Sequence, residues 1–449
     1  MAVKRIALVN PNRWKPKTAP VALDYLSSSL ESRRFQVDLL DLCHAADVKQ
    51  TVQSFFREHP ADLVGVTLRN LDDIHYGRFM VPELRDIMRH IKDAANAPIV
   101  LGGSGFSICP ERVLEYCGLD MGIAGEGEFA LPMLASDRSD RSDRSDLSDI
   151  PGLVYRDGDG FRRNPVGTND LAGMCLSGRS KVDYSRYISK GGAKGGTGVQ
   201  TKRGCTQDCI YCIVPAVEGR VMRLRPVPDI VDEIENLMAK GVKRFFFADS
   251  EFNYPEEHAK MICREMIDRK LGDKMRWSVY TAPKPFSLEL AKLMVEAGCR
   301  LAIFTIENAN EKVLKCMRKD FTPDDVRQMA RACKEAGLTF SYCTMFGGPG
   351  ETMNTVLETL DLMKEVRAQG VTMWDPPGMR IYPNTPLADI VREEGFSRKN
   401  PNLHGRIKGN DDFFEPVYYL SAQMGILATG IKAWRKVGLI RQGISALRA

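Results

Sequence analysis

The sequence predicts an α/β protein with two parallel-stranded domains and a small, mostly helical C-terminal extension. Short β-rich runs alternate with amphipathic helical stretches twice along the 449 residues, first up to residue 135 and again from residue 198. Strands that alternate with helices favour parallel sheets, because each helix returns the chain across the sheet. We expect a doubly wound sheet at 1–135, a linker with a hairpin at 136–197, a partial barrel at 198–395 and the extension at 396–449.

The composition indicates a globular, cytoplasmic protein. Hydrophobic residues make up 43% of the chain, and the formal net charge is only +5 with both signs mixed along the sequence. We therefore expect no nucleic-acid partner. The apolar run in "MAVKRIALVNPN" is too short for a signal peptide, and no window approaches the roughly 18 apolar residues of a membrane span. The twelve cysteines of such a chain should be reduced, and some should be metal ligands.

Five β-rich runs predict the strands of the first domain. In a doubly wound sheet, ligands bind outside the carboxyl ends of the strands. The glycines of "GGSGFS" follow the fourth run and remove side chains where the backbone must approach another group closely. We therefore expect a ligand at this edge. The runs are 5–11, 36–42, 62–68, 97–103 and 120–128.

The segment between the domains has two parts with different compositions. Residues 136–149 read "SDRSDRSDRSDLSD", a low-complexity repeat with nothing to bury, which is typical of a solvated linker. The following stretch, "GLVYRDGDGFRRNP", has the pattern of a hairpin.

Six further runs predict a partial barrel of six β/α units rather than a complete barrel of eight. The helical stretches between them are longer, and several end on glycine. The active site of this partial barrel should open at the carboxyl ends of its strands. The runs are 198–204, 244–250, 276–282, 300–308, 339–348 and 371–383.

Three cysteines lie together after the first barrel run, in "TKRGCTQDCIYCIVP". Cys205, Cys209 and Cys212 have the spacing C-x₃-C-x₂-C. They make a poor zinc site without a distant fourth ligand. An iron–sulfur cube can take three thiolates from one loop and leave one iron open. A small molecule with an amine and a carboxylate could chelate that iron and receive an electron from the cluster.

This loop resembles the signature of the radical S-adenosylmethionine (SAM) enzymes, C-x₃-C-x-aromatic-C, with Tyr211 as the aromatic residue. The resemblance implies a [4Fe–4S] cluster on the three cysteines, SAM on the fourth iron and Tyr211 over the adenine. The family binds the SAM amino group with a glycine-glycine-glutamate run, where this chain has "ADSEFN" without the glycines. The further candidates for SAM contacts are Asp249, Ser250, Glu251, Glu307 and, in "FGGPGET", Gly347 and Gly348.

The first domain resembles the Rossmann-like vitamin B12-binding domain that precedes the barrel in cobalamin-dependent radical SAM enzymes. The resemblance rests on "DLVGVTLRNLDD", "VLGGSGFSICPE" and "GIAGEGE". The D-x-H-x-x-G motif, whose histidine binds cobalt in other B12 domains, is absent, and His75 in "DIHYG" should be a polar loop residue. Arg69 cannot coordinate a metal and is the candidate for the lower face of the cobalt, with a surface salt bridge as the alternative. The other candidates for cobalamin contacts are Thr67, Gly102, Gly103, Ser104, Glu126 and Gly127.

Together the two resemblances imply a cobalamin-dependent radical SAM C-methyltransferase of class B. Such an enzyme transfers a methyl group from SAM, through methylcobalamin, to a carbon of a small-molecule or lipid-like substrate. In the resembling enzymes a second SAM yields a 5′-deoxyadenosyl radical, and a reductase, flavodoxin or ferredoxin donates electrons. The protein positions the reactants and excludes water. Four residues that follow barrel strands could contact substrate or pack in the core: Tyr280, Trp374, Asp375 and Tyr382.

Three other functions are compatible with some of the same motifs. An oxidative cyclase or rearrangement enzyme would use the same cofactors without methyl transfer. A tRNA methylthiotransferase would need three further cysteines on a second cluster, and Cys43, Cys109 and Cys117 are scattered. A non-catalytic B12 sensor leaves the cysteine loop unexplained. The amphipathic stretch at 422–440 should cap the barrel or the substrate cleft, with binding to a membrane surface as the alternative.

Overall fold

The computed structural model divides the chain into two compact units. The first unit comprises residues 1–72, 79–189 and 232–242, and the second comprises 73–78, 190–231 and 243–449. The structure describes residues 4–14, 17–73, 78–137, 144–172, 178–187, 196–367, 373–374, 378–407 and 412–431. His75 lies outside these ranges.

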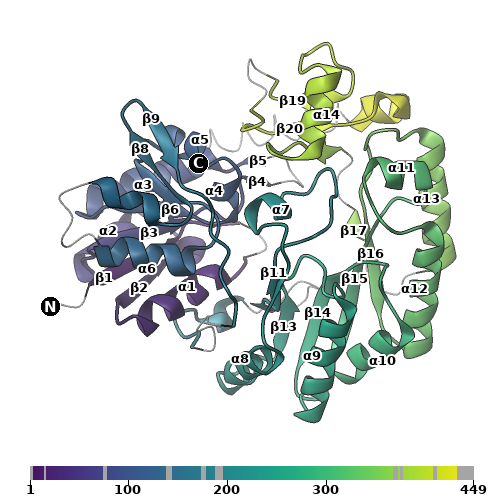
Figure 1. Ribbon diagram of the computed structural model, residues 1–449, viewed down its shortest axis with the longest axis horizontal. Helices are drawn as coiled ribbons and strands as arrows, with labels where there is room; N and C mark the ends of the chain where they lie inside the picture. The colour runs from purple at the N-terminus through teal and green to yellow at the C-terminus, as the bar shows by residue number, and fades with distance from the viewer. Residues whose placement is uncertain are drawn as a thin grey trace. The chain divides into compact units, whose positions relative to one another are not determined.

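The first unit is built on a seven-stranded sheet with the order β2-β1-β3-β6-β7-β8-β9 (Figure 1). Its first five strands pair in parallel, as the alternation of strands and helices predicted. The order reverses between β1 and β3, and such a switch point is where ligands bind in doubly wound sheets. The parallel strands are β1 (Arg5–Asn10), β2 (Gln36–Asp41), β3 (Leu63–Thr67), β6 (Ile99–Gly102) and β7 (Met121–Ile123).

Helices pack around this sheet through apolar residues at helical spacing. In α3, for example, Leu84, Ile87, Met88 and Ile91 are buried, which is the i, i+3, i+4 pattern of a single helix face. Helix α1 packs with α6, and α3 packs with α2 and α5. The helices are α1 (Val21–Ser32), α2 (Val48–Glu58), α3 (Val81–Ala94), α4 (Ser104–Ile108), α5 (Pro110–Cys117) and α6 (Gly127–Asp137).

The hairpin expected after the linker extends the sheet of the first unit. Its strands are β8 (Leu153–Asp157) and β9 (Gly160–Arg163), and β8 pairs antiparallel with β7. Gly158 adopts φ +59° in the two-residue turn, a conformation that favours glycine in such hairpins. The sequence indicated the hairpin but not its attachment to the sheet.

Arg179 lies at the centre of a buried charge cluster in the first unit. Its guanidinium pairs with Asp24 of α1 at 3.3 Å and with Glu233 at 2.6 Å, and all three side chains are at most 1% exposed. The hydroxyls of Tyr184 and Tyr25 donate to Asp24 and Glu233 at 2.7 and 2.8 Å. The cluster therefore joins three separate segments of this unit.

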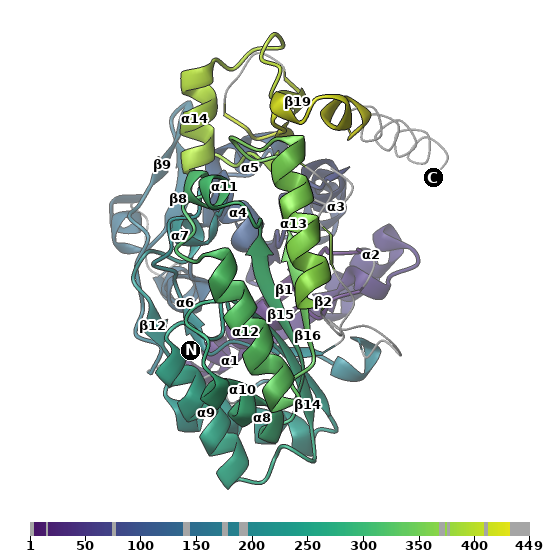
Figure 2. The ribbon, with the colours of Figure 1, turned by 90° about the vertical axis from the view of Figure 1, so that its right-hand side faces the viewer.

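The second unit contains the predicted partial barrel. Its six parallel strands have the order β10-β13-β14-β15-β16-β17. Figure 2 shows α10, α12 and α13 along one side of β14, β15 and β16. The strands are β10 (Thr197–Val199), β13 (Arg244–Phe247), β14 (Arg276–Thr281), β15 (Cys299–Glu307), β16 (Phe340–Thr344) and β17 (Met373–Trp374). The helices are α8 (Val227–Ala239), whose last turns belong to the first unit, α9 (Glu256–Asp268), α10 (Leu288–Glu296), α11 (Glu311–Cys316), α12 (Pro323–Ala336) and α13 (Met353–Val366).

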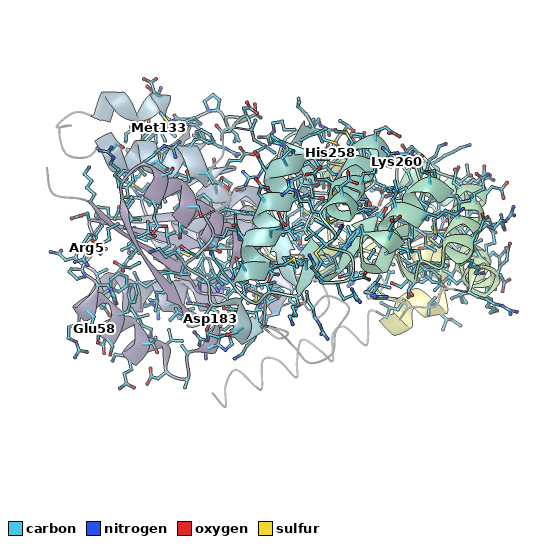
Figure 3. All side chains as sticks on the ribbon, turned by 90° about the horizontal axis from the view of Figure 1, so that it is seen from below. Arg5, Glu58, Met133, Asp183, His258 and Lys260 are labelled. Carbon is cyan, nitrogen blue, oxygen red and sulfur yellow. The ribbon has the colours of Figure 1, made fainter. Side chains whose placement is uncertain are left out.

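Helix α9 contacts the start of the cysteine segment and the neighbouring helix α10 through different side chains. His258 and Lys260, labelled in Figure 3, both lie on this helix. The His258 ring lies 3.4 Å from the carbonyl of Thr201 and is 7% exposed. Lys260 pairs with Glu257 and with Glu289 of α10, each at 2.9 Å. One face of the helix thus holds the start of the cysteine segment, and charged pairs join α9 to its neighbour.

The run at 198–204 does not form the single strand that the sequence predicted. Strand β10 ends at Val199, and β11 (Lys202–Arg203) pairs antiparallel with β12 (Arg223–Leu224). The physical reason is the bend at Thr201, whose amide and hydroxyl donate to Asp249 at 2.8 and 2.6 Å instead of continuing a strand ladder.

The run at 371–383 is also divided. Its second part, β18 (Met379–Arg380), pairs with β20 (Val417–Tyr419), which pairs with β19 (Leu403–Gly405). Two prolines precede Gly378, which adopts φ +104°, and proline cannot donate to a strand ladder. The described residues from 378 to 431 thus contain a small sheet, α14 (Pro386–Glu394) and a helical turn at 426–431, and of these β18 and α14 lie before residue 396, where the extension was expected to begin. The described part of the chain has no helix with the length and apolarity needed to cross a bilayer.

Candidate active site

The three cysteines lie on a loop whose ends are closed by the β11–β12 ribbon. The Cys205 amide donates to the carbonyl of Gly219 at 3.1 Å, which holds the two sides of the loop together. Gly204 adopts φ +85°, and a Cβ there would lie 2.2 Å from the carbonyl oxygen of Val221. Only glycine fits at this position. Cys205 and Cys209 are buried, and Cys212 is half-buried.

The electrostatics of the loop fit a set of thiolate ligands. Burial raises the pKa of all three thiols, and burial together with the nearby Cys209 and Cys205 raises that of Cys212 to about 12. Lys319 lowers the pKa of each thiol. Bound iron would stabilise the thiolates that burial disfavours. Within the described ranges, no three His, Cys, Asp or Glu side chains group as ligands of a single metal ion. The cysteines of an iron–sulfur cube bind separate corners and need not converge on one point.

A turn after α11 contacts the cysteine loop, and no specific pattern in the sequence predicted this contact. The Ile210 amide donates to the carbonyl of Met317 at 3.2 Å. Arg318 pairs with Asp208 at 2.5 Å, and Lys319 Nζ lies 3.6 Å from Cys209 Sγ. The mixed charges of "MRKD" are equally typical of an exposed turn, so only the fold brings them to the cysteines.

Tyr211 and Glu307, two predicted site residues, are in direct contact. The Tyr211 hydroxyl donates to Glu307 Oε1 at 2.6 Å, and Glu307 is 5% exposed. Glu307 ends β15 at φ +54°, next to a register shift between β15 and β16. Left-handed backbone in a non-glycine residue is uncommon and often occurs at functional sites. These contacts bring the end of the fourth barrel strand to the cysteine loop.

The three residues after the second barrel strand have different surroundings. Asp249 uses both carboxylate oxygens to hold Thr201, so its role in the structure is to shape the loop. Ser250 hydrogen-bonds the Cys205 thiol and lowers its pKa. Glu251 Oε1 accepts from the Thr305 hydroxyl at 2.8 Å, whereas its buried Oε2 has no partner among the described residues. Burial raises the pKa of Glu251 to about 7. A buried carboxylate oxygen without a protein partner fits a ligand that has an amine or metal to offer.

Half-buried side chains line the inner face of the barrel strands. Trp277 donates to the carbonyl of Ala297 at the end of α10, so alternate residues of β14 face the helices and Tyr280 faces inward. Tyr280 packs edge-to-face with Phe246 of β13, with ring centroids 5.7 Å apart. Tyr382 packs against the Arg380 guanidinium, 4.6 Å from its ring centroid. The Trp374 side chain and Asp375 lie outside the described residues.

Gly347 and Gly348 allow close packing against Leu420 of the C-terminal extension and Met379 of β18. Gly347 adopts φ +100°, and a Cβ there would lie 2.5 Å from Leu420. A Cβ on Gly348 would lie 2.6 Å from Met379. Glu351, which the sequence analysis missed, accepts from the Gly347 amide and, at 2.6 Å, from Asn308 beside Glu307. Glu351 thus connects the ends of β15 and β16.

In the first unit, the cobalamin candidates gather at the carboxyl ends of β3, β6 and β7, which are neighbours in the sheet. Gly103 adopts φ +99°, and a Cβ there would lie 2.5 Å from Thr67 Oγ1. Close packing of two loops therefore explains this glycine. The Ser104 hydroxyl donates to the carbonyl of Arg69 at 2.7 Å, and the Arg69 side chain is exposed.

The other cobalamin candidates, Gly102, Glu126 and Gly127, are positioned differently. A Cβ on Gly102 would make ordinary contacts, 3.6 Å from the carbonyl oxygen of Ile123. Glu126 accepts from the Asn169 side chain at 2.8 Å, and Gly127 begins α6. The structure therefore leaves Gly102 and the exposed Arg69 at the carboxyl-end edge of the sheet without a close packing contact among the described residues that explains them.

Comparison with known proteins identifies both halves of the chain. Residues 13–135 match the B12 binding domain family, and residues 199–363 match the radical SAM superfamily. The chain is 31% identical to the tryptophan 2-C-methyltransferase of Streptomyces laurentii, over 87% of this chain and 74% of that protein.

Two solved structures of the radical SAM methyltransferase TsrM from Kitasatospora setae are similar over nearly the whole chain. One, with cobalamin and a [4Fe–4S] cluster bound, is 30% identical with a TM-score of 0.84, covering 94% of this chain and 85% of TsrM. The other, with tryptophan and the SAM analogue aza-SAM bound, is 30% identical with a TM-score of 0.85, covering 95% and 87%. The chain therefore belongs to the cobalamin-dependent radical SAM methyltransferases, as its motifs predicted.

Proposed function

We propose that this enzyme methylates a carbon of tryptophan or of a closely related indole. The observation that carries the proposal is the similarity to the tryptophan 2-C-methyltransferase along 87% of the chain. The inner face of the barrel is compatible with a flat aromatic substrate, because Phe246 and Tyr280 present an edge-to-face aromatic pair there.

Three cofactors would serve this reaction, and the chain has residues suited to each. Cys205, Cys209 and Cys212 would hold a [4Fe–4S] cluster. Glu251 would offer SAM a carboxylate oxygen that has no partner among the described residues. When bound, the cluster, SAM and cobalamin supply single-electron chemistry and the methyl group. The other proposed SAM contacts are Tyr211, Ser250, Glu307, Gly347 and Gly348, and the proposed cobalamin contacts are Thr67, Arg69, Gly102, Gly103, Ser104, Glu126 and Gly127.

The protein's own contribution is positioning. Tyr211 and Glu307 fix each other through a 2.6 Å hydrogen bond, so a ligand meets groups that are already oriented. Glu351 holds the glycines after β16 by accepting from the Gly347 amide. Asp249, which the sequence placed among the ligand contacts, acts one step away by fixing the bend before the cysteine loop.

The cofactors also imply a partner and a compartment. A reductase, flavodoxin or ferredoxin would supply electrons to the cluster. Reduced thiols are maintained in the cytoplasm, so we place the enzyme there. We further propose functional limits of 1–135 for cobalamin binding and 198–395 for the radical SAM barrel, joined by 136–197 and followed by the extension at 396–449.

The test is methyl transfer by the anaerobically reconstituted enzyme. With SAM, cobalamin, a low-potential reductant and tryptophan, mass spectrometry should detect a product about 14 Da heavier than the substrate. NMR should place the new methyl group on a ring carbon, and SAM labelled in its methyl group should pass the label to the product. The Cys209→Ala variant is the matched control and should form none. Methylation of another indole but not of tryptophan would redefine the substrate, and an altered product without added mass would overturn methyl transfer.

A further inference from the structure

Lys319 places a positive charge beside one of the cluster cysteines. Its Nζ lies 3.6 Å from Cys209 Sγ, and its side chain is only 8% exposed. An ordinary lysine is protonated at neutral pH, since its pKa is about 10.4. The ammonium group is therefore a cation shielded from water next to a sulfur atom that would bind iron.

A carboxylate and an aromatic ring lie close to the Lys319 ammonium group. Glu307 Oε1 lies 3.7 Å from Nζ, but the same oxygen accepts the shorter hydrogen bond from Tyr211. The Phe321 ring lies 5.4 Å from Nζ. Burial and an aromatic face both limit screening of the charge by water.

The backbone fixes Lys319 against the cysteine loop. The Ile210 amide donates to the carbonyl of Met317, and these residues are one position from Cys209 and two from Lys319. The neighbouring Arg318 points instead to Asp208, and this pair is nearly half exposed, at 49% and 44%. The two cations of the turn therefore differ in burial and in partner, and Arg318 can serve as a control.

We propose that Lys319 is a positioning residue that raises the reduction potential of the cluster by stabilising its reduced form. The inference rests on the proposed function, because it requires the cluster on Cys205, Cys209 and Cys212. One-electron reduction adds negative charge to the cluster. A fixed cation and a hydrogen bond to a ligating sulfur both stabilise that charge, and such bonds are among the features that set cluster potentials. Without Lys319, Glu307 would also act on the cluster as an uncompensated negative charge.

The test is a redox titration of the full chain carrying its cluster, without SAM. Titanium(III) citrate gives one electron to the cluster and becomes titanium(IV), and the EPR signal of the reduced cluster follows the reaction. K319M should lower the equilibrium constant for reduction at least tenfold, which is about 59 mV for one electron. K319R keeps the charge and should remain within threefold of the wild type. R318M removes an exposed charge and should also remain within threefold.

A second variant keeps the inference testable if K319M takes up no iron. E307Q removes the opposing negative charge and should shift the potential upward. K319M with an intact cluster and a wild-type potential would overturn the inference, as would an unchanged potential in E307Q. A wild-type chain that binds no iron would overturn the proposed function, and this inference with it. Bound iron with no effect of these charges would overturn the inference alone.

Discussion

The replacement of Arg179 by methionine tests whether the buried charge cluster holds the first unit together. The variant would leave two buried carboxylates, Asp24 and Glu233, without their shared cation. Asp24 would keep two donors, the Tyr184 hydroxyl at 2.7 Å and the Lys181 amide at 2.9 Å. Glu233 would keep the Tyr25 hydroxyl at 2.8 Å. The larger cost should therefore fall on Glu233.

Removing one partner of a buried ion pair costs about 3–5 kcal/mol, because the other charge stays buried. Since tyrosine hydroxyls still donate hydrogen bonds to both carboxylates, we expect Arg179→Met to lower the free energy of unfolding by about 4 kcal/mol. Urea unfolding followed by circular dichroism measures this loss as a lower midpoint. Adding Glu233→Gln should recover about 1–2 kcal/mol, because a neutral amide costs less to bury than a charge.

The matched control is Arg156→Met, which breaks an exposed pair with Asp120 of 2.8 Å in the same unit. Exposed pairs contribute at most about 1 kcal/mol. If Arg179→Met and Arg156→Met unfold at the same urea concentration, the cluster does not stabilise this unit and the reasoning is wrong.

Three further predictions concern a glycine, a buried acid and a loop-shaping aspartate. Gly103→Ala should lower the free energy of unfolding, measured with urea, by about 1–3 kcal/mol, because the φ of +99° and a contact of 2.5 Å both oppose a Cβ. In the control Gly158→Ala the new Cβ meets no atom within 4 Å, so the loss should be smaller. Burial raises the pKa of Glu351 to about 7, so its neutral form is favoured in the folded state and stability is lost as the pH rises from about 4.5 to 7. The contribution of Glu351 to this loss should reach about 3 kcal/mol. Glu351→Gln should therefore lose about 3 kcal/mol less stability than the wild type over this range, while the buried Glu251, whose pKa is also raised to about 7, keeps its own contribution. An identical dependence in the variant would contradict the burial argument. Asp249→Ala removes the acceptor of two Thr201 donors and should destabilise the second unit by about 1–3 kcal/mol. SAM binding by the cluster-loaded protein should stay unchanged. A specific loss of SAM affinity would instead make Asp249 a ligand contact.

Hydrophobic periodicity was sufficient to predict most of the strands. The runs at 62–68 and 276–282, for example, correspond to β3 and β14 with each end shifted by at most one residue. Both are buried in parallel sheets, where the apolar pattern directly reflects the environment. The cysteine spacing predicted the centre of the site because the three proposed ligands of the cluster lie in one short loop. A pattern of this kind is visible in the local sequence.

The features that could not be predicted depend on contacts between distant residues. The division of the run at 198–204 follows from Asp249, 48 positions beyond Thr201. Lys319 reaches Cys209 across 110 positions. Neither partner carries a local pattern that distinguishes it from an ordinary polar residue. Likewise, Gly103 was expected to make room for a ligand, whereas the fold places a loop against it.

The most direct test of the central claim is to count iron and sulfide in the anaerobically reconstituted chain. The wild type should bind about four irons and four sulfides, with an optical band at about 420 nm. A variant with alanine at Cys205, Cys209 and Cys212 should bind none, although cobalamin should still bind. An equal iron content in the two proteins would contradict the assignment of these three cysteines as the ligands of the cluster.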